Sequence, residues 1–136
     1  MAFVVDNSVV VGWHLSSQTT AYSDSVLKAM VTNTAHVPGL WVLEFSNVMR
    51  KALLAKKITQ SRCQEIFLMQ KSLALSVHPD VSDPAENLAL AMRYQLSSYD
   101  AAYLELAMRL HLPVATSDGA LRDASVAAGV GVFTPK

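Results

Sequence analysis

The sequence has one cysteine, Cys63, and only five glycines and five prolines among 136 residues. A single cysteine excludes an internal disulfide, so a reducing cytoplasm is the setting that we expect. The few glycines and prolines exclude a collagen-like or low-complexity chain. The sequence also lacks any apolar run of about 18 residues and any basic N-terminal region before an apolar run. We therefore predict neither a membrane span nor a secretory signal.

An excess of charge of one sign is missing as well. Eleven basic and eleven acidic residues cancel, while 51% of the residues are hydrophobic. This composition is typical of a compact folded chain, and the length suits one domain, which we assign to residues 1–136. Nucleic-acid-binding proteins are often basic overall, but a local basic patch is enough for binding.

Short apolar runs alternate with helical patterns along the chain. Strands are predicted at 3–5, 35–37, 76–78, 112–116 and 130–133. Helices are predicted at 8–15, 20–31, 41–55, 59–73, from 83 onward, 98–110 and 118–128. Strands separated by helices are typical of a parallel sheet covered on both faces. The expected fold class is α/β, with a central parallel sheet flanked by helices in three layers.

Four acidic residues stand at places where this fold holds its ligands. Asp6 and Asp118 follow two of the predicted strands, and open α/β sheets bind ligands at the carboxyl ends of their strands. Glu44 and Asp100 lie in the first turns of two predicted helices. Helices that follow strands begin at that same edge, so all four carboxylates are expected to converge there.

Each acid also has a purely structural explanation. Asp6 and Asp118 are good N-cap residues, and the helix dipole favours acids in first turns. Asp100 fits this explanation least, because it shares a helix face with Tyr103 and other apolar residues. An unpaired carboxylate on an apolar face is costly, and a bound cation would relieve that cost.

Carboxylate oxygens are hard ligands, which suit Mg²⁺ or Mn²⁺. No histidine or cysteine spacing indicates zinc, and no serine, histidine and acid set indicates covalent hydrolysis. Metal-assisted hydrolysis of a phosphodiester bond is the chemistry that fits the remaining residues.

Two other small α/β classes fit the sequence less well. A response-regulator receiver needs an acidic pair after its first strand, whereas Asn7 and Ser8 follow Asp6 here. A haloacid-dehalogenase-like phosphatase needs a second aspartate at the position of Ser8. A non-enzymatic binding domain would not need four inward acids.

Four segments together resemble the PIN-domain family. They are Val5-Asp6-Asn7-Ser8, Glu44-Phe45-Ser46-Asn47-Val48, Leu96-Ser97-Ser98-Tyr99-Asp100-Ala101-Ala102-Tyr103-Leu104 and Thr116-Ser117-Asp118-Gly119-Ala120-Leu121. The third segment is most similar to the VapC branch. The likeness runs from Asp6 to Leu121 in the family's order.

The resemblance implies a site, a reaction and partners. The implied ligands of Mg²⁺ or Mn²⁺ are Asp6, Glu44, Asp100 and Asp118, with hydrogen-bond support from Ser8, Asn47 and Thr116. It implies a VapC-type toxin: a cytoplasmic, homodimeric endoribonuclease that cleaves RNA and is silenced by an antitoxin protein. A PIN nuclease in RNA processing or DNA cleavage, or a non-catalytic regulatory binding domain, is the alternative.

Five of the eleven basic residues fall around one predicted helix-turn-helix: Arg50, Lys51, Lys56, Lys57 and Arg62. The first four are candidate RNA contacts, since Lys51 lies two turns beyond Glu44 on the same side. A solvated helix surface is the more common explanation of such a cluster and is slightly favoured here. Asp123 is expected to lie on the surface, away from the other acids.

Overall fold

The computed structural model describes residues 1–79 and 83–136. The strands of this part are β1 (Ala2–Val5), β2 (Thr34–Pro38), β3 (Leu75–His78) and β4 (Val114–Ala115). The helices are α1 (Asn7–His14), the short 3₁₀ helix η1 (Ser16–Gln18), α2 (Ala21–Ala29), α3 (Trp41–Leu54), α4 (Gln60–Ser72), α5 (Pro84–Tyr94), α6 (Ser98–Leu110) and α7 (Gly119–Ala127).

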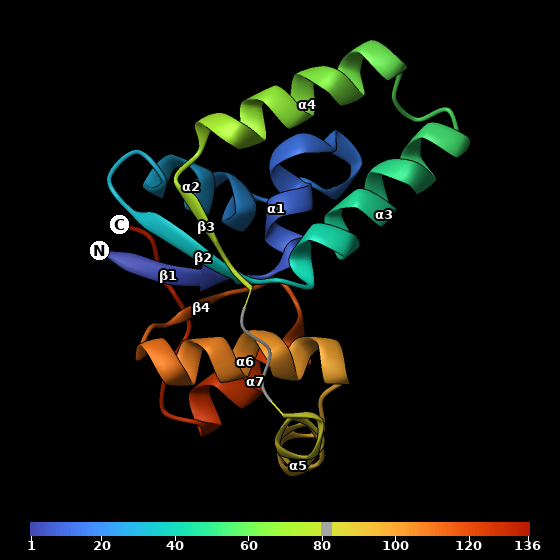
Figure 1. The fold of residues 1–136 in the computed structure, drawn as a ribbon. Helices are drawn as coiled ribbons and strands as arrows, with labels where there is room; N and C mark the ends of the chain where they lie inside the picture. The colour runs from blue at the N-terminus through green and yellow to red at the C-terminus, as the bar shows by residue number, and fades with distance from the viewer. Residues whose placement is uncertain (80–82) are drawn as a thin grey trace.

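The strands form one parallel sheet in the order β3-β2-β1-β4. Figure 1 shows α1, α2, α3 and α4 on one side of the sheet and α5, α6 and α7 on the other. The predicted α/β fold with a parallel sheet between two helical layers is therefore confirmed. The strand β1, one of the two inner strands, is buried between the two helical layers, as its continuous apolar sequence predicts.

The last two strands are shorter than predicted. The 112–116 strand is reduced to Val114–Ala115, and of the 130–133 strand only Val132 pairs with the sheet, through an isolated parallel bridge to Val114. Gly131 has a φ of +79°, which interrupts an extended conformation. The prediction of a regular fifth strand is therefore wrong, although Phe133 still stacks on Phe3 with ring centroids 4.0 Å apart.

Two helices begin with the caps that the sequence predicts. The Asp83 carboxylate accepts hydrogen bonds from the backbone N–H groups of Ala85 and Glu86, with Pro84 at the start of α5. Asp118 caps α7, which is followed by Gly129 at a φ of +83°. These local signals set where the helices begin and end, and hence which residues face the sheet.

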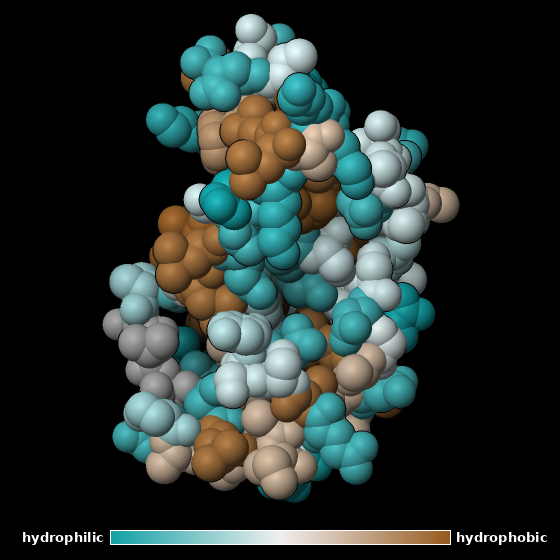
Figure 2. All heavy atoms as spheres, turned by 90° about the vertical axis from the view of Figure 1, so that its right-hand side faces the viewer, coloured by the Kyte–Doolittle hydropathy of each residue, from teal (hydrophilic) through white to brown (hydrophobic). Residues whose placement is uncertain are grey.

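The carboxyl ends of the strands point to the right in Figure 1, where α1, α3 and α6 begin. The helix α6 packs on β1, β2 and β4 from below, and α1 packs on α3 above. Figure 2 looks onto this edge and shows separate hydrophobic patches with hydrophilic residues between them. None of the described helices is long and apolar enough to cross a membrane.

Candidate active site

Asp6 stands at the centre of the sheet edge, directly after β1. Its side chain is only 4% exposed. Oδ1 accepts the backbone N–H of Val9 at 3.3 Å and the Ser8 hydroxyl at 2.6 Å. The Thr116 hydroxyl donates to Oδ2 at 2.5 Å from the end of β4. Asp6 is thus the N-cap of α1, and its carboxylate is held both from α1 and from the residue that follows β4.

Thr116 joins Asp6 to Asp118. Its side chain is fully buried, and its Oγ1 accepts the backbone N–H of Asp118 at 2.9 Å while donating to Asp6. Asp118 caps α7 through Oδ2, which accepts the Leu121 N–H at 2.9 Å. The capping explanation is therefore correct for both aspartates, but capping occupies only one carboxylate oxygen of Asp118.

Glu44 approaches from the first turn of α3 and is half-buried. The Tyr103 hydroxyl, on α6, donates to Glu44 Oε1 at 2.6 Å across the sheet edge. Tyr103 is 1% exposed. The sequence pattern indicated only an apolar role for Tyr103, although its position three residues after Asp100 on the same helix face would have pointed to the site.

Asp100 lies in the first turn of α6, whose N-cap is Ser97. The Ser97 hydroxyl accepts the backbone N–H of Asp100 at 3.1 Å. The Asp100 carboxylate is half-buried, and a hydrogen bond with the Ser97 side chain lowers its pKa against the larger effects of burial and of Asp118, which raise it. Unlike Asp6 and Asp118, Asp100 is not the cap of its helix, which Ser97 caps instead.

Burial and mutual repulsion raise the pKa values of three of these carboxyls. Loss of hydration is the main cause for Asp6, Glu44 and Asp100. The charge of Asp100 further raises the pKa of Asp6 and of Glu44, and the charge of Asp118 raises the pKa of Asp100. The four acids therefore share one electrostatic environment, as their places in the fold predict.

The donor set fits a hard divalent cation. The four side chains offer only oxygen, and among the described residues no lysine or arginine forms an ion pair with any of them. In that same part of the chain, no three acidic, histidine or cysteine side chains are placed closely enough to enclose an ion. Uncompensated, desolvated negative charge is the observation that favours a cation here.

Two polar residues near the site differ from expectation. Asn47 is exposed, and no hydrogen bond links it to the four acids within the described ranges. Arg122, which received no role from the sequence, points back toward the site. Its Nη2 lies 3.5 Å from the Thr116 carbonyl oxygen, and its guanidinium lies 6.0 Å from the centre of the Tyr22 ring.

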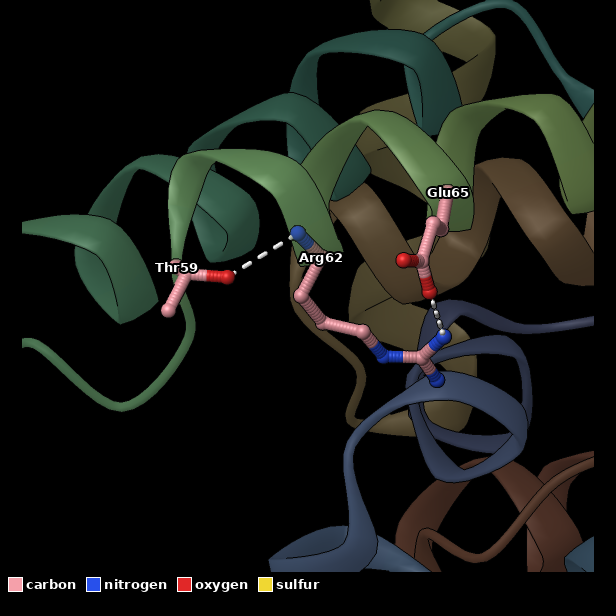
Figure 3. A network of polar contacts seen from close by, with 3 residues as sticks. All are labelled: Thr59, Arg62 and Glu65. Carbon is pink, nitrogen blue, oxygen red and sulfur yellow. Dashed lines mark hydrogen bonds and ion pairs between the residues drawn. The ribbon is translucent and has the colours of Figure 1, made fainter.

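The basic cluster divides into residues that face the site and residues that do not. Lys51 and Lys57 line a hollow of about 550 Å³ beside Ser8, whereas Arg50 and Lys56 are not among its lining residues. Arg62 donates to Glu65 Oε2 at 3.3 Å, as Figure 3 shows, so its charge is partly neutralised.

The family model of the PIN domain matches residues 3–127. The chain belongs to the PIN-domain family. The match excludes the receiver and dehalogenase-like alternatives, and PIN domains are typically metal-dependent nucleases. In this PIN domain the matched segment includes all four acids.

A solved structure supports the same fold. The crystal structure of PAE2754 from Pyrobaculum aerophilum is similar, with a TM-score of 0.65 and 19% sequence identity. The likeness covers 98% of this chain and 88% of that one. At this sequence identity, the likeness supports only the fold of the PIN domain. No protein of curated function matches the chain in sequence.

Proposed function

We propose that this PIN domain is a Mg²⁺- or Mn²⁺-dependent endoribonuclease that hydrolyses phosphodiester bonds of RNA. The observation that carries the proposal is the group of four acids at one sheet edge, with three raised pKa values and no cationic partner among the described residues. Asp6, Glu44, Asp100 and Asp118 would hold the cation. A cation bound there supplies an activated water and neutralises charge on the phosphate.

The protein residues fix the positions of the oxygens. Ser8 and Thr116 orient the two oxygens of Asp6, so its carboxylate has little freedom to rotate. Tyr103 holds Glu44 Oε1, and no hydrogen bond from a described residue occupies Oε2. Hydrogen bonds of this kind raise affinity because they hold ligands in place before binding.

Within this proposal the chain acts as the toxin of a VapC-type pair, in the cytoplasm and under the control of an antitoxin protein. The likeness of the Asp100 segment to the VapC branch supports this role. A homodimer is proposed with it, and exposed apolar side chains on α3 and α4 (Val42, Leu43 and Leu68) agree with burial in a larger assembly.

The test compares single strands of RNA and DNA of the same mixed sequences, incubated with purified protein and Mn²⁺ or Mg²⁺. The proposal expects RNA to be cut internally and DNA to stay intact. Cleavage of DNA would move the assignment to a DNA-acting PIN nuclease. Growth arrest on expression in bacteria, absent for Asp6→Asn, would support the toxin role, and normal growth with active enzyme would favour RNA processing.

A further inference from the structure

His36 on β2 and His78 on the neighbouring strand β3 form a pair of imidazoles that the chemistry described so far does not use. His36 Nδ1 lies 2.8 Å from His78 Nε2, and the ring centroids are 5.1 Å apart. The two residues are 42 positions apart in the chain, so only the pairing of the strands brings them together. For this reason no spacing in the sequence indicated an imidazole site.

The register of the strands places both side chains on the same face of the sheet. His36 pairs with Ser76 and Pro38 pairs with His78, so the two histidines occupy diagonal positions on adjacent parallel strands. Side chains two positions apart along a strand point to the same face. The strand β3 is at the edge of the sheet, and both histidines are partly exposed, so an ion can reach them from solvent.

The distance between the two ring nitrogens suits coordination of one ion. Nitrogen ligands at about 2.0–2.1 Å from an ion lie about 2.9 Å apart at a right angle and about 3.3 Å apart in a tetrahedron. The 2.8 Å between His36 Nδ1 and His78 Nε2 is close to this range. Rotation of the two rings about their side-chain bonds would turn both lone pairs toward one ion.

The pair can take the neutral form that binds metals. Burial, and secondly the charge of His78, lower the pKa of His36. Without a metal, one ring donates an N–H to the other, and a change of tautomer moves that proton to the far nitrogen of its ring. The far nitrogens of His36 and His78 are not buried atoms without a partner, as His14 Nδ1 is, so this change leaves no orphaned N–H.

The ligand type differs from that of the catalytic edge. Imidazole nitrogen suits Zn²⁺, Ni²⁺ and Cu²⁺, whereas carboxylate oxygen suits Mg²⁺ and Mn²⁺. Among the described residues, no third acidic, histidine or cysteine side chain lies close enough to complete a set of three. Water would therefore occupy the remaining positions around an ion held by the two histidines.

We propose that His36 and His78 form a second metal site, for an imidazole-binding divalent ion such as Zn²⁺ or Ni²⁺, which joins the edge strand β3 to β2. Because β2 leads directly into α3, which carries Glu44, an ion at this site stabilises the sheet next to the catalytic edge. The site does not depend on the nuclease function proposed above.

Thermal unfolding in excess Mg²⁺, with and without Zn²⁺, tests the site on the whole chain. Zn²⁺ should raise the melting temperature of the wild type, because an ion that binds only the folded state stabilises it. His36→Gln and His78→Gln should each weaken Zn²⁺ binding by about tenfold or more. His111→Gln removes an exposed imidazole at the end of α6 and should leave binding unchanged. Asp100→Asn, which alters the carboxylate site, should keep the stabilisation by Zn²⁺ at the pair.

A titration with Ni²⁺, followed by NMR of the histidine rings, tests the wild type without any substitution. Ni²⁺ is paramagnetic and broadens the signals of the rings that bind it. The signals of His36 and His78 should disappear together, at lower Ni²⁺ concentrations than those of His14 and His111. This measurement decides the question even if a variant of the pair does not fold.

Loss of the Zn²⁺ effect in both pair variants, or joint broadening of the two rings, would support the site. Stabilisation that persists in both pair variants and disappears in Asp100→Asn would place the ion at the carboxylates and overturn the proposal. A wild type that does not respond to Zn²⁺ would overturn it as well. The same holds if His111 broadens before the pair, because binding would then be adventitious.

Discussion

The Tyr103 hydroxyl donates a hydrogen bond of 2.6 Å to Glu44 Oε1, which joins α6 to α3 across the open edge of the sheet. The two residues are 59 positions apart, and Tyr103 is almost completely buried. A buried hydroxyl needs a partner, and a half-buried carboxylate needs donors, so each residue meets the need of the other. This contact fixes Glu44, a proposed metal ligand. Among the described contacts, no residue of α3 itself holds the Glu44 side chain.

Tyr103→Phe keeps the ring and removes the donor. We expect a loss of stability of about 1–3 kcal/mol, because a hydrogen bond to a charged group is lost. Apparent Mn²⁺ affinity and cleavage should both fall about 10–100-fold. Urea unfolding and Mn²⁺ titration of the purified variant measure the two effects. Tyr99→Phe, an exposed neighbour on α6, is the control and should leave both unchanged.

Thr116→Val and Thr116→Ser separate the hydroxyl from the shape of the side chain. Valine removes a donor to Asp6 and an acceptor for the Asp118 N–H in a fully buried place, so a cost of about 2–3 kcal/mol is expected. Serine keeps both hydrogen bonds and should retain most metal-dependent activity. Loss of activity in Thr116→Ser together with full activity in Thr116→Val would show that packing of the methyl group, and not the hydroxyl, matters.

The metal-free protein should become less stable as the pH rises. The pKa values of Asp6, Glu44 and Asp100 are higher in the folded protein than their ordinary values near 4. In the window above about pH 4 the folded state therefore holds more protons than the unfolded state, and its stabilisation by them is lost as pH rises through the raised pKa values. Asp100→Asn removes one such group.

The measurement is urea unfolding in EDTA from about pH 4 to 8. The free energy of unfolding of the wild type, minus that of Asp100→Asn, should decrease across this range. Stabilisation of the wild type by Mn²⁺ should increase across the same range, because the cation competes with protons for the carboxylates. A difference that rises with pH would contradict the electrostatic description of the site.

Gly12 on α1 allows α1 to lie close to α2 and η1. A Cβ at this position would lie 2.8 Å from Ser23 Oγ and 3.1 Å from the Gln18 carbonyl oxygen. Gly12→Ala should therefore cost about 1–3 kcal/mol in thermal or urea unfolding. A Cβ added at Gly119 would meet no atom of the described residues within 4 Å, so Gly119→Ala should be neutral or slightly stabilising. A neutral Gly12→Ala would contradict this helix contact.

Much of the fold follows from local sequence signals. Alternating apolar runs and helical patterns predict the layers, and caps such as Asp83 and Asp118 mark where helices begin. That Asp100 belongs to a functional site is also predictable. Its carboxylate falls on the apolar face of α6, and burying an unpaired charge is costly in any fold. These features depend on a few neighbouring residues, which the sequence places together.

Features that depend on distant segments were not predictable. The pairing of Tyr103 with Glu44 requires the crossing of α6 and α3, which neither helix specifies alone. The shortened last strand depends on how Gly131 turns beside Val114. Similarly, the division of the basic cluster depends on which side chains of α3 and of the segment after it face α1.

Cleavage of a mixed-sequence RNA pool by the wild type, by Asp6→Asn and by Asp123→Asn tests the central claim most directly, each with Mn²⁺, with Mg²⁺ and with EDTA. Asp123 is an exposed acid on α7 and serves as the matched control. The account predicts metal-dependent cutting by the wild type and Asp123→Asn, and none by folded Asp6→Asn or in EDTA. Cutting that persists in EDTA or in Asp6→Asn would contradict a metal-dependent site built on these carboxylates.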